Sequence, residues 1–321
     1  MKPIASAQGV LTCILARHAS EALALGRSLK LNSPDLPSVC VYEGDLPPEK
    51  LSALRTCFSD VIRIRPEHER LGWLVKHVMA VYSPFEHTLF VDSDCLVLRD
   101  LRPAFVAAGA RSIAFATKSE PAQETGETLY AGISLDYLLR RFSVDWWPQI
   151  LGGGHFFFHN TAEARRLFER ARDWGAPERI CEFGWTDRTR VAPDELTLQI
   201  ALVEAGLGRA CALVDYPLVC WTPWERARPD VFTGRISLRA PDTGIRRKSD
   251  HFFIAHFGGD TSNPNYHREQ WRLRLWDSAF ASLTHRALAS ATKPFLHAGA
   301  HTARKSRHAW HRLQRVVATK R

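Results

Sequence analysis

No apolar run in the 321-residue sequence approaches the roughly 20 residues needed to span a bilayer. The N-terminus also lacks the layout of a secretory signal, because one Lys precedes the short apolar stretch GVLTCILA and no small-residue cleavage site follows it. A hydrophobic fraction of 45% with 24% charged residues is typical of a folded globular chain. We therefore expect this stretch to be a buried strand of a cytoplasmic protein.

The sequence has no Cys-x-x-Cys pair. Its seven cysteines are scattered and odd in number, which argues against both a zinc ribbon and a disulfide framework. We expect buried, reduced thiols.

Acidic residues are absent after Asp277. Nine of the 43 Lys and Arg lie in residues 278–321, so residues 1–277 carry 34 basic and 34 acidic side chains and the net charge of +9 belongs to the tail. With apolar residues at helical spacing, 303–318 could form an interfacial helix on an anionic membrane surface. A disordered, solvated tail is an equal alternative. Nucleic-acid binding is disfavoured, because no recognisable binding module precedes the tail.

The first hundred residues alternate between strand-like and helix-like segments. Such alternation predicts an α/β fold with a mostly parallel central sheet flanked by helices, and ligands bind beyond the carboxyl ends of its strands. The expected strands are 10–16, 37–42, 60–64 and 87–92, and the expected helices are 20–31, 47–58 and 72–82.

Beyond residue 110 the alternation loosens. No repeat or interdomain linker is visible, so we expect one domain over 1–277, with a nucleotide-binding half at 1–105 and a sugar and acceptor half at 106–277, followed by the basic tail 278–321. The expected elements are strands at 111–118, 152–160 and 251–260 and helices at 161–174 and 194–206.

In the stretch HTLFVDSDCLVLRD, an apolar run is followed directly by two aspartates, Asp92 and Asp94. Buried carboxylates are costly unless they are paired or bound to a cation. Two such carboxylates suit Mn²⁺ or Mg²⁺ and leave coordination positions for phosphate oxygens. A solvated turn is the alternative, but the apolar residues on both sides favour a strand end at the ligand edge.

The segment WLVKHVMAVYSPFEHTLFVDSDCLVLRDLRPAF resembles the nucleotide-sugar-binding core of GT-A glycosyltransferases, especially family 8 with glycogenin and the lipopolysaccharide galactosyltransferases. Lys76, Tyr82 and Asp92-Ser93-Asp94 follow in the family's order with similar spacing. The resemblance covers residues 10–105. Beyond them it is limited to three short segments, QILGGGHFFFHNTAEARRLFERA, PDELTLQIAL and IAHFGGD. It implies a GT-A fold, which is a Rossmann-like nucleotide-diphospho-sugar transferase fold.

The resemblance also implies a site. Its third metal ligand is His256, its sugar-binding Asp is Asp194, and the residue near the reacting carbon is Glu195, where the family usually has Gln. The family's diphosphate-binding Lys has no counterpart after His256, and Arg268 is a nearby base that could replace it. The metal ligands are then Asp92, Asp94 and His256; the catalytic residues Asp194 and Glu195; and the donor-binding residues Ala16, Arg17, His18, Lys76, Ser93, Gly153, Gly154 and Gly258.

These residues predict a metal-dependent transfer of sugar from a nucleotide-diphosphate sugar, with UDP-sugars as the first candidates, to a hydroxyl acceptor such as a glycan or glycolipid. The resemblance implies retention of the anomeric configuration. One alternative is a sugar nucleotidyltransferase, but LARHASEALALG lacks a Gly-rich triphosphate loop. Another is a non-catalytic membrane- or polyanion-binding protein on a GT-A fold. For the transferase we expect a cytoplasmic location, with the basic tail as a peripheral contact to the inner face of the membrane.

Overall fold

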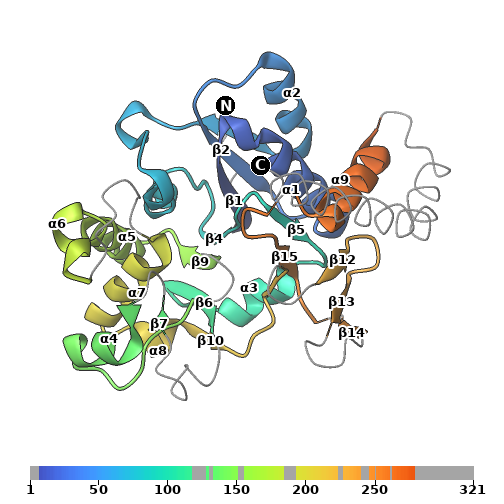
Figure 1. The fold of residues 1–321 in the computed structure, drawn as a ribbon. Coiled ribbons are helices and arrows are strands. Elements are labelled where there is room, and N and C mark those ends of the chain that lie inside the picture. Colours follow the sequence, from blue (N-terminus) through green and yellow to red (C-terminus); the bar gives the residue numbers. More distant parts are fainter. Residues whose placement is uncertain are drawn as a thin grey trace, which may run out of the picture.

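The computed structural model describes residues 7–117, 128–129, 133–150, 155–183, 193–222, 227–239, 246–249, 251–260 and 262–278. A seven-stranded sheet forms its centre (Figure 1). Four of the neighbouring strand pairs are parallel, and only β9 runs antiparallel to both of its neighbours. The strand order is β10 (Ala212–Val214), β6 (Ile113–Thr117), β9 (Phe156–His159), β4 (His87–Phe90), β1 (Gln8–Leu15), β2 (Ser38–Glu43) and β3 (Asp60–Arg63). The predicted mostly parallel α/β sheet is confirmed.

Helices cover both faces of this sheet (Figure 1). One face packs against α1, α2 and α3, and the other packs against η3, α5 and α7. None of the helices within the described ranges is long and apolar enough to cross a membrane. The helices are η1 (Ala16–His18), α1 (Ala19–Asn32), α2 (Pro48–Cys57), η2 (Pro66–His68), η3 (Gly72–Val81), α3 (Arg102–Ala108), α4 (Leu135–Phe142), α5 (Ala162–Trp174), α6 (Pro177–Ile180), η5 (Cys181–Phe183), α7 (Asp194–Glu204), α8 (Gly208–Cys211) and α9 (Pro264–Asp277).

The two cores follow from the alternation of side chains along each strand. In β9, Phe156 and Phe158 face the core that contains Phe168 of α5, whereas Phe157 between them packs against Phe105 of α3. Successive residues of a strand point to opposite faces, so an unbroken apolar run fits a sheet that is buried on both sides.

Helix α5 shows how local sequence sets an element. The Thr161 hydroxyl accepts a hydrogen bond from the backbone N–H of Ala164 and caps the first turn. Ala164, Leu167, Phe168 and Ala171 then form one buried stripe at helical spacing. The helix predicted over 161–174 is confirmed, with Thr161 as its N-cap.

A second sheet brings the far end of the chain against the Asp92–Asp94 segment. Its order is β11 (Val219–Trp221), β15 (Ile254–His256) and β5 (Cys95–Val97), and β15 pairs antiparallel with β5. The strand expected over 251–260 is therefore only three residues long. The segment between β11 and β15 forms a three-stranded sheet of β12 (Arg228–Asp230), β13 (Arg235–Arg239) and β14 (Arg246–Ser249), and β7 (Thr128–Leu129) pairs with β8 (Ile133–Ser134).

Two further expectations are corrected in detail. The helix expected over 72–82 is the 3₁₀ helix η3, and the strand expected over 87–92 ends at Phe90. The glycines at 152–154 and the basic tail from residue 279 lie outside the described residues.

Candidate active site

Asp92 and Asp94 lie in the turn that joins β4 to β5. The backbone N–H of Val91 still donates to the carbonyl of Leu11 in β1 at 2.9 Å, and after that the chain leaves the sheet. Because β4 and β1 are parallel, this turn lies at the same sheet edge as η1, which follows the carboxyl end of β1. The structure thus places both carboxylates at the carboxyl edge, as predicted, with Asp92 two and Asp94 four residues beyond the end of β4.

The pairing of β15 with β5 brings His256 to these carboxylates. In this pairing His256 lies opposite Cys95, and Cys95 is the residue that directly follows Asp94. Its Nε2 atom lies 3.2 Å from Asp94 Oδ1 and 3.9 Å from Asp92 Oδ2. One ligand atom from each of the three residues lies within 4.8 Å of the others. The structure therefore brings together the three residues that the sequence nominated as metal ligands.

The glycine pair after His256 holds Asp94 from the other side. The backbone N–H of Gly259 donates to Asp94 Oδ2 at 2.5 Å. Gly258 and Gly259 have φ of +57° and +76°, a left-handed conformation that L side chains rarely adopt. Gly258 was predicted to be a donor-binding residue. In the structure, the amide that contacts Asp94 belongs to the next residue, Gly259.

Lys76 of η3 reaches across the turn to a third carboxylate. Its Nζ atom lies 2.9 Å from Asp92 Oδ1 and 2.8 Å from Asp194 Oδ2. Burial opposes the charge on Lys76, but Asp194 and Asp92 outweigh it and hold the pKa of the lysine well above its usual value, with a further contribution from Glu195. The ammonium group is thus a fixed positive charge between two elements of the site.

The two aspartates of the turn differ in their acidity. Burial raises the pKa of Asp92 to about 6, against the attraction of Lys76 and His256. Burial also acts on Asp94, but the hydrogen bond and charge of His256, together with the amide of Gly259, hold its pKa well below the usual range. Asp94 is consequently the firmly ionised member of the pair.

Asp194 is the first residue of α7, and it is buried there. A carboxylate in the first turn is favoured by the helix dipole. Its backbone carbonyl lies 3.2 Å from Nε2 of His77, the residue after Lys76, so η3 fixes both the side chain and the main chain of Asp194. Glu195 is partly buried in the same turn.

Two carboxylates and an imidazole are a donor set that Mn²⁺ and Mg²⁺ accept, and the imidazole favours Mn²⁺. Asp92 and Asp94 keep 18% and 16% of their side-chain surface exposed, whereas His256 keeps 4%. His256 is therefore a buried ligand, whereas the two aspartates remain partly exposed to solvent. The residues present fit a divalent cation, which Asp92, Asp94 and His256 would hold.

The other predicted residues fall into three groups. Ala16, Arg17 and His18 form η1 at the carboxyl end of β1, and Ser93 lies between the two aspartates. Gly153 and Gly154 lie outside the described residues. The suggested substitute for the missing lysine, Arg268, is buried, with its guanidinium on Glu269 at 2.7 Å and on the carbonyl of Pro229 at 2.6 Å; these contacts assign it to packing of α9.

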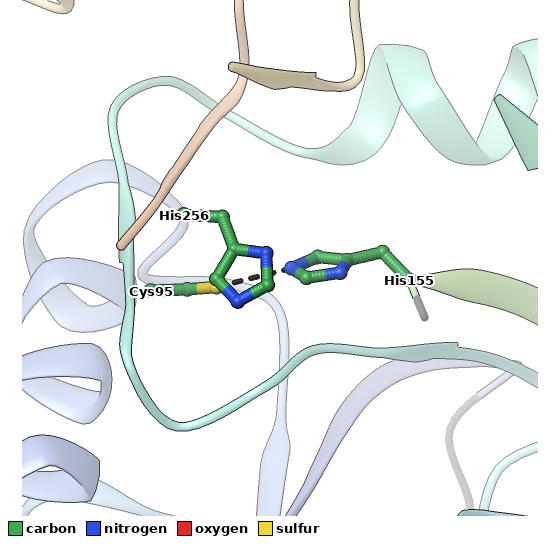
Figure 2. Close-up of side chains that lie close together, drawn as sticks. All are labelled: Cys95, His155 and His256. Atoms are coloured by element: carbon green, nitrogen blue, oxygen red, sulfur yellow. Dashed lines mark hydrogen bonds between the residues drawn. The ribbon is translucent and has the colours of Figure 1, made fainter. Parts of the chain in front are cut away.

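Sequence reasoning missed two residues that border the site. Figure 2 shows Cys95 and His155 converging with His256, and Cys95 Sγ lies 3.0 Å from His155 Nε2. Cys95 reads as an ordinary apolar residue of β5, and His155 follows a glycine triplet with no spacing that marks it. The pairing of β15 with β5 and the start of β9 bring the three residues together.

No protein-family model matches the sequence, and no curated protein matches it. The solved structure of galactosyltransferase LgtC with donor and acceptor sugar analogs has a TM-score of 0.50 and 12% identity, covering 88% of this chain and 95% of that one. Bifunctional glycosyltransferase WbbM gives 0.49 and 11%, over 79% of this chain and 46% of that one, so this chain spans about half its length. Glycosyltransferase GlyE of Streptococcus pneumoniae gives 0.48 and 14%, over 90% and 64%. The likeness to LgtC concerns the fold, and this chain has the GT-A glycosyltransferase fold.

Proposed function

We propose that this protein is a metal-dependent glycosyltransferase that moves a sugar from a nucleotide-diphosphate sugar to a hydroxyl acceptor. The observation that carries the proposal is the convergence of Asp92, Asp94 and His256 at the carboxyl edge of the sheet. Lys76 joins this group to Asp194, so the cation ligands and the proposed sugar contact form one connected cluster. The GT-A fold supports the same assignment.

The chemistry requires stabilisation of a departing diphosphate. Asp92, Asp94 and His256 hold the cation, Mn²⁺ or Mg²⁺, which supplies positive charge to the diphosphate when bound. Lys76 bridges Asp92 and Asp194 through an ion pair with each carboxylate. The Asp194 carboxylate then accepts hydrogen bonds from hydroxyl groups of the donor sugar. On the nucleotide side, η1 and Ser93 line the edge where the base and ribose approach.

Glu195 has two possible roles in a retaining transfer. It can attack the anomeric carbon as a nucleophile, or it can support a front-side attack in which the departing phosphate takes the acceptor proton. Glu195→Gln separates the two, because an amide cannot form the covalent glycosyl intermediate. Turnover by that variant within a few-fold of the wild type excludes the nucleophile, and a loss of several orders of magnitude, rescued by azide as an external nucleophile, excludes the front-side route.

The experiment for the proposal is a screen of nucleotide sugars, with UDP-sugars first, for Mn²⁺-dependent release of free nucleoside diphosphate. We expect at least one donor to be turned over, and Asp94→Asn to abolish that turnover. Asp100→Asn is the matched control, since Asp100 lies on the same segment but is bonded to Arg102 at the surface. Equal turnover by Asp94→Asn and the wild type would remove the metal role.

The proposal for the acceptor is based on the positive charge of the C-terminal tail. We infer that the basic residues of 278–321 attract an anionic surface, which would present a glycolipid acceptor to the site. Sedimentation with anionic lipid vesicles tests this for the full chain and for a chain that ends at residue 284. Equal pelleting of both would remove the proposed membrane role of the tail.

A further inference from the structure

A second group of metal-binding side chains lies directly behind the Asp92–Asp94 turn. Cys95 comes from β5, His256 from the neighbouring strand β15, and His155 from the residue before β9. Figure 2 shows the thiol and the two imidazoles pointing toward one another. One ligand atom of each lies within 4.8 Å of the other two. These three residues are called the Cys–His cluster below.

The Cys–His cluster is more deeply buried than the carboxylate group beside it. Cys95 and His155 are fully buried, and His256 is 3% exposed. Its donors are a sulfur and two aromatic nitrogens, with no carboxylate among them. Thiolate and imidazole are the ligands that select Zn²⁺ over Mg²⁺ or Mn²⁺. The two groups therefore prefer different cations although they share His256.

The distances fit a zinc-sized ion. Zn–S bonds of about 2.3 Å and Zn–N bonds of about 2.0–2.1 Å place the ligand atoms of a tetrahedral ion roughly 3.5 Å apart. The Cys95 Sγ to His155 Nε2 distance of 3.0 Å has only to lengthen by a few tenths of an ångström, and the rest of the cluster already lies within 4.8 Å.

A hydrogen bond between thiol and imidazole accounts for Cys95 and His155 alone. It does not extend to His256, whose ring is tilted against that of His155 at a centroid distance of 4.7 Å and whose Nε2 lies 3.2 Å from Asp94. Three good zinc ligands thus converge in a space from which solvent is excluded. Binding would replace the thiol proton by the metal and release that proton.

We propose that Cys95, His155 and His256 form a second metal site, selective for Zn²⁺, and that its occupation removes His256 from the Asp92–Asp94 site. The selectivity stands on the donor set and on burial. The consequence for catalysis rests on the proposed function, since it requires that His256 serve the catalytic cation. Zn²⁺ then acts as an inhibitor that competes with Mn²⁺ for one shared ligand.

Titration of the metal-free full-length protein with Co²⁺ tests the site itself, because a thiolate bound to Co²⁺ gives a near-ultraviolet charge-transfer band. We expect this band to saturate at one Co²⁺ per chain and to disappear on addition of one equivalent of Zn²⁺. Cys95→Ser should abolish it, and His155→Gln should weaken Co²⁺ binding at least tenfold. No band in the wild type, or an equal band in Cys95→Ser, overturns the proposal.

Cys220→Ser is the matched control, because Cys220 is also fully buried and lies in β11 of the same three-stranded sheet. It should keep the full band. Asp92→Asn should keep it too, since Asp92 belongs only to the carboxylate group. Circular dichroism and a thermal melt of each variant identify any that does not fold, and the band of His155→Gln provides the answer if Cys95→Ser is unfolded.

The inhibitory consequence is measured separately, as Mn²⁺-dependent turnover with increasing Zn²⁺, relative to the zinc-free rate of each variant. We expect the Zn²⁺ concentration for half-inhibition to rise at least tenfold in Cys95→Ser and to rise with Mn²⁺ in the wild type. Unchanged inhibition in Cys95→Ser overturns the competition for His256. A Co²⁺ band without any turnover of nucleotide sugar would leave the site standing and contradict the proposed function instead.

Discussion

Lys76 Nζ lies 2.8 Å from a carboxylate oxygen of Asp194, which begins a helix far along the chain. The same ammonium group lies 2.9 Å from Asp92. It thereby ties the turn at the sheet edge to α7 through charge rather than through apolar packing. Removing the lysine would leave two largely buried carboxylates facing each other, which is costly unless one takes up a proton.

Lys76→Met is expected to destabilise the metal-free protein by about 3–5 kcal/mol, the range for breaking a buried ion pair from one side. Urea unfolding measures this loss. The matched control is Lys30→Met, because Lys30 lies at the same 2.9 Å from Asp277 but its side chain is 41% exposed. Exposed pairs contribute about 0–1 kcal/mol. Equal losses in the two variants would contradict the buried role of Lys76.

Gly259→Ala tests whether the loop after β15 positions Asp94. The backbone at Gly259 has φ of +76°, so alanine there costs about 1–2 kcal/mol and shifts the amide that donates to Asp94. Partners that orient a metal ligand are typically worth about 10–100-fold in metal affinity. We expect a loss of that order in Mn²⁺ affinity, measured from the Mn²⁺ dependence of turnover.

Gly206→Ala is the control for this variant. Gly206 follows α7 with φ of +68°, and a Cβ at either glycine would meet nothing within 4 Å. Both variants therefore carry similar backbone strain, but only one lies at the site. If Gly206→Ala lowers Mn²⁺ affinity as much as Gly259→Ala does, the effect comes from global stability.

The sequence predicted the sheet and its functional edge well, because these depend on local signals. Alternating strands and helices indicated the parallel order, and the apolar run before Asp92 placed the carboxylates at a strand end. His256 was predicted as a metal ligand mainly through the resemblance. The Lys76–Asp194 contact could not be predicted, because it depends on how η3 packs beside α7 in three dimensions.

Cys95 and His155 were missed for the same physical reason. The two side chains meet because β15 pairs antiparallel with β5 and because β9 begins directly after His155. Neither of these features can be deduced from the spacing of residues in the sequence. Arg268 does not take the place of the diphosphate-binding lysine that the family has after its metal-binding His, because its guanidinium is bonded to Glu269.

His77 predicts a specific response to acid. Burial lowers its pKa to about 4, although the neighbouring Asp194 acts in the opposite direction. Between pH 6.5 and 4 the unfolded chain therefore binds a proton at His77 that the folded chain does not. The stability of the folded state must fall as the pH falls through this window, by at most on the order of 3 kcal/mol from this residue.

Urea unfolding of wild type and His77→Gln across pH 4–7 isolates this contribution. Asp92, with its raised pKa, changes stability in the opposite sense over part of the window, but it does so in both proteins. We expect the free energy of unfolding to fall less steeply with acid in His77→Gln. Parallel curves for the two proteins would show that His77 is not the group responsible.

The proposed function requires Asp92, Asp94 and His256 to bind one divalent cation together with a nucleoside diphosphate. The most direct measurement is the loss of the electron paramagnetic resonance signal of free Mn²⁺ on titration with protein in the presence of UDP. We expect one bound Mn²⁺ per chain in the wild type and in Asp100→Asn, and none in Asp94→Asn. Equal Mn²⁺ binding by Asp94→Asn and the wild type would contradict the proposed function.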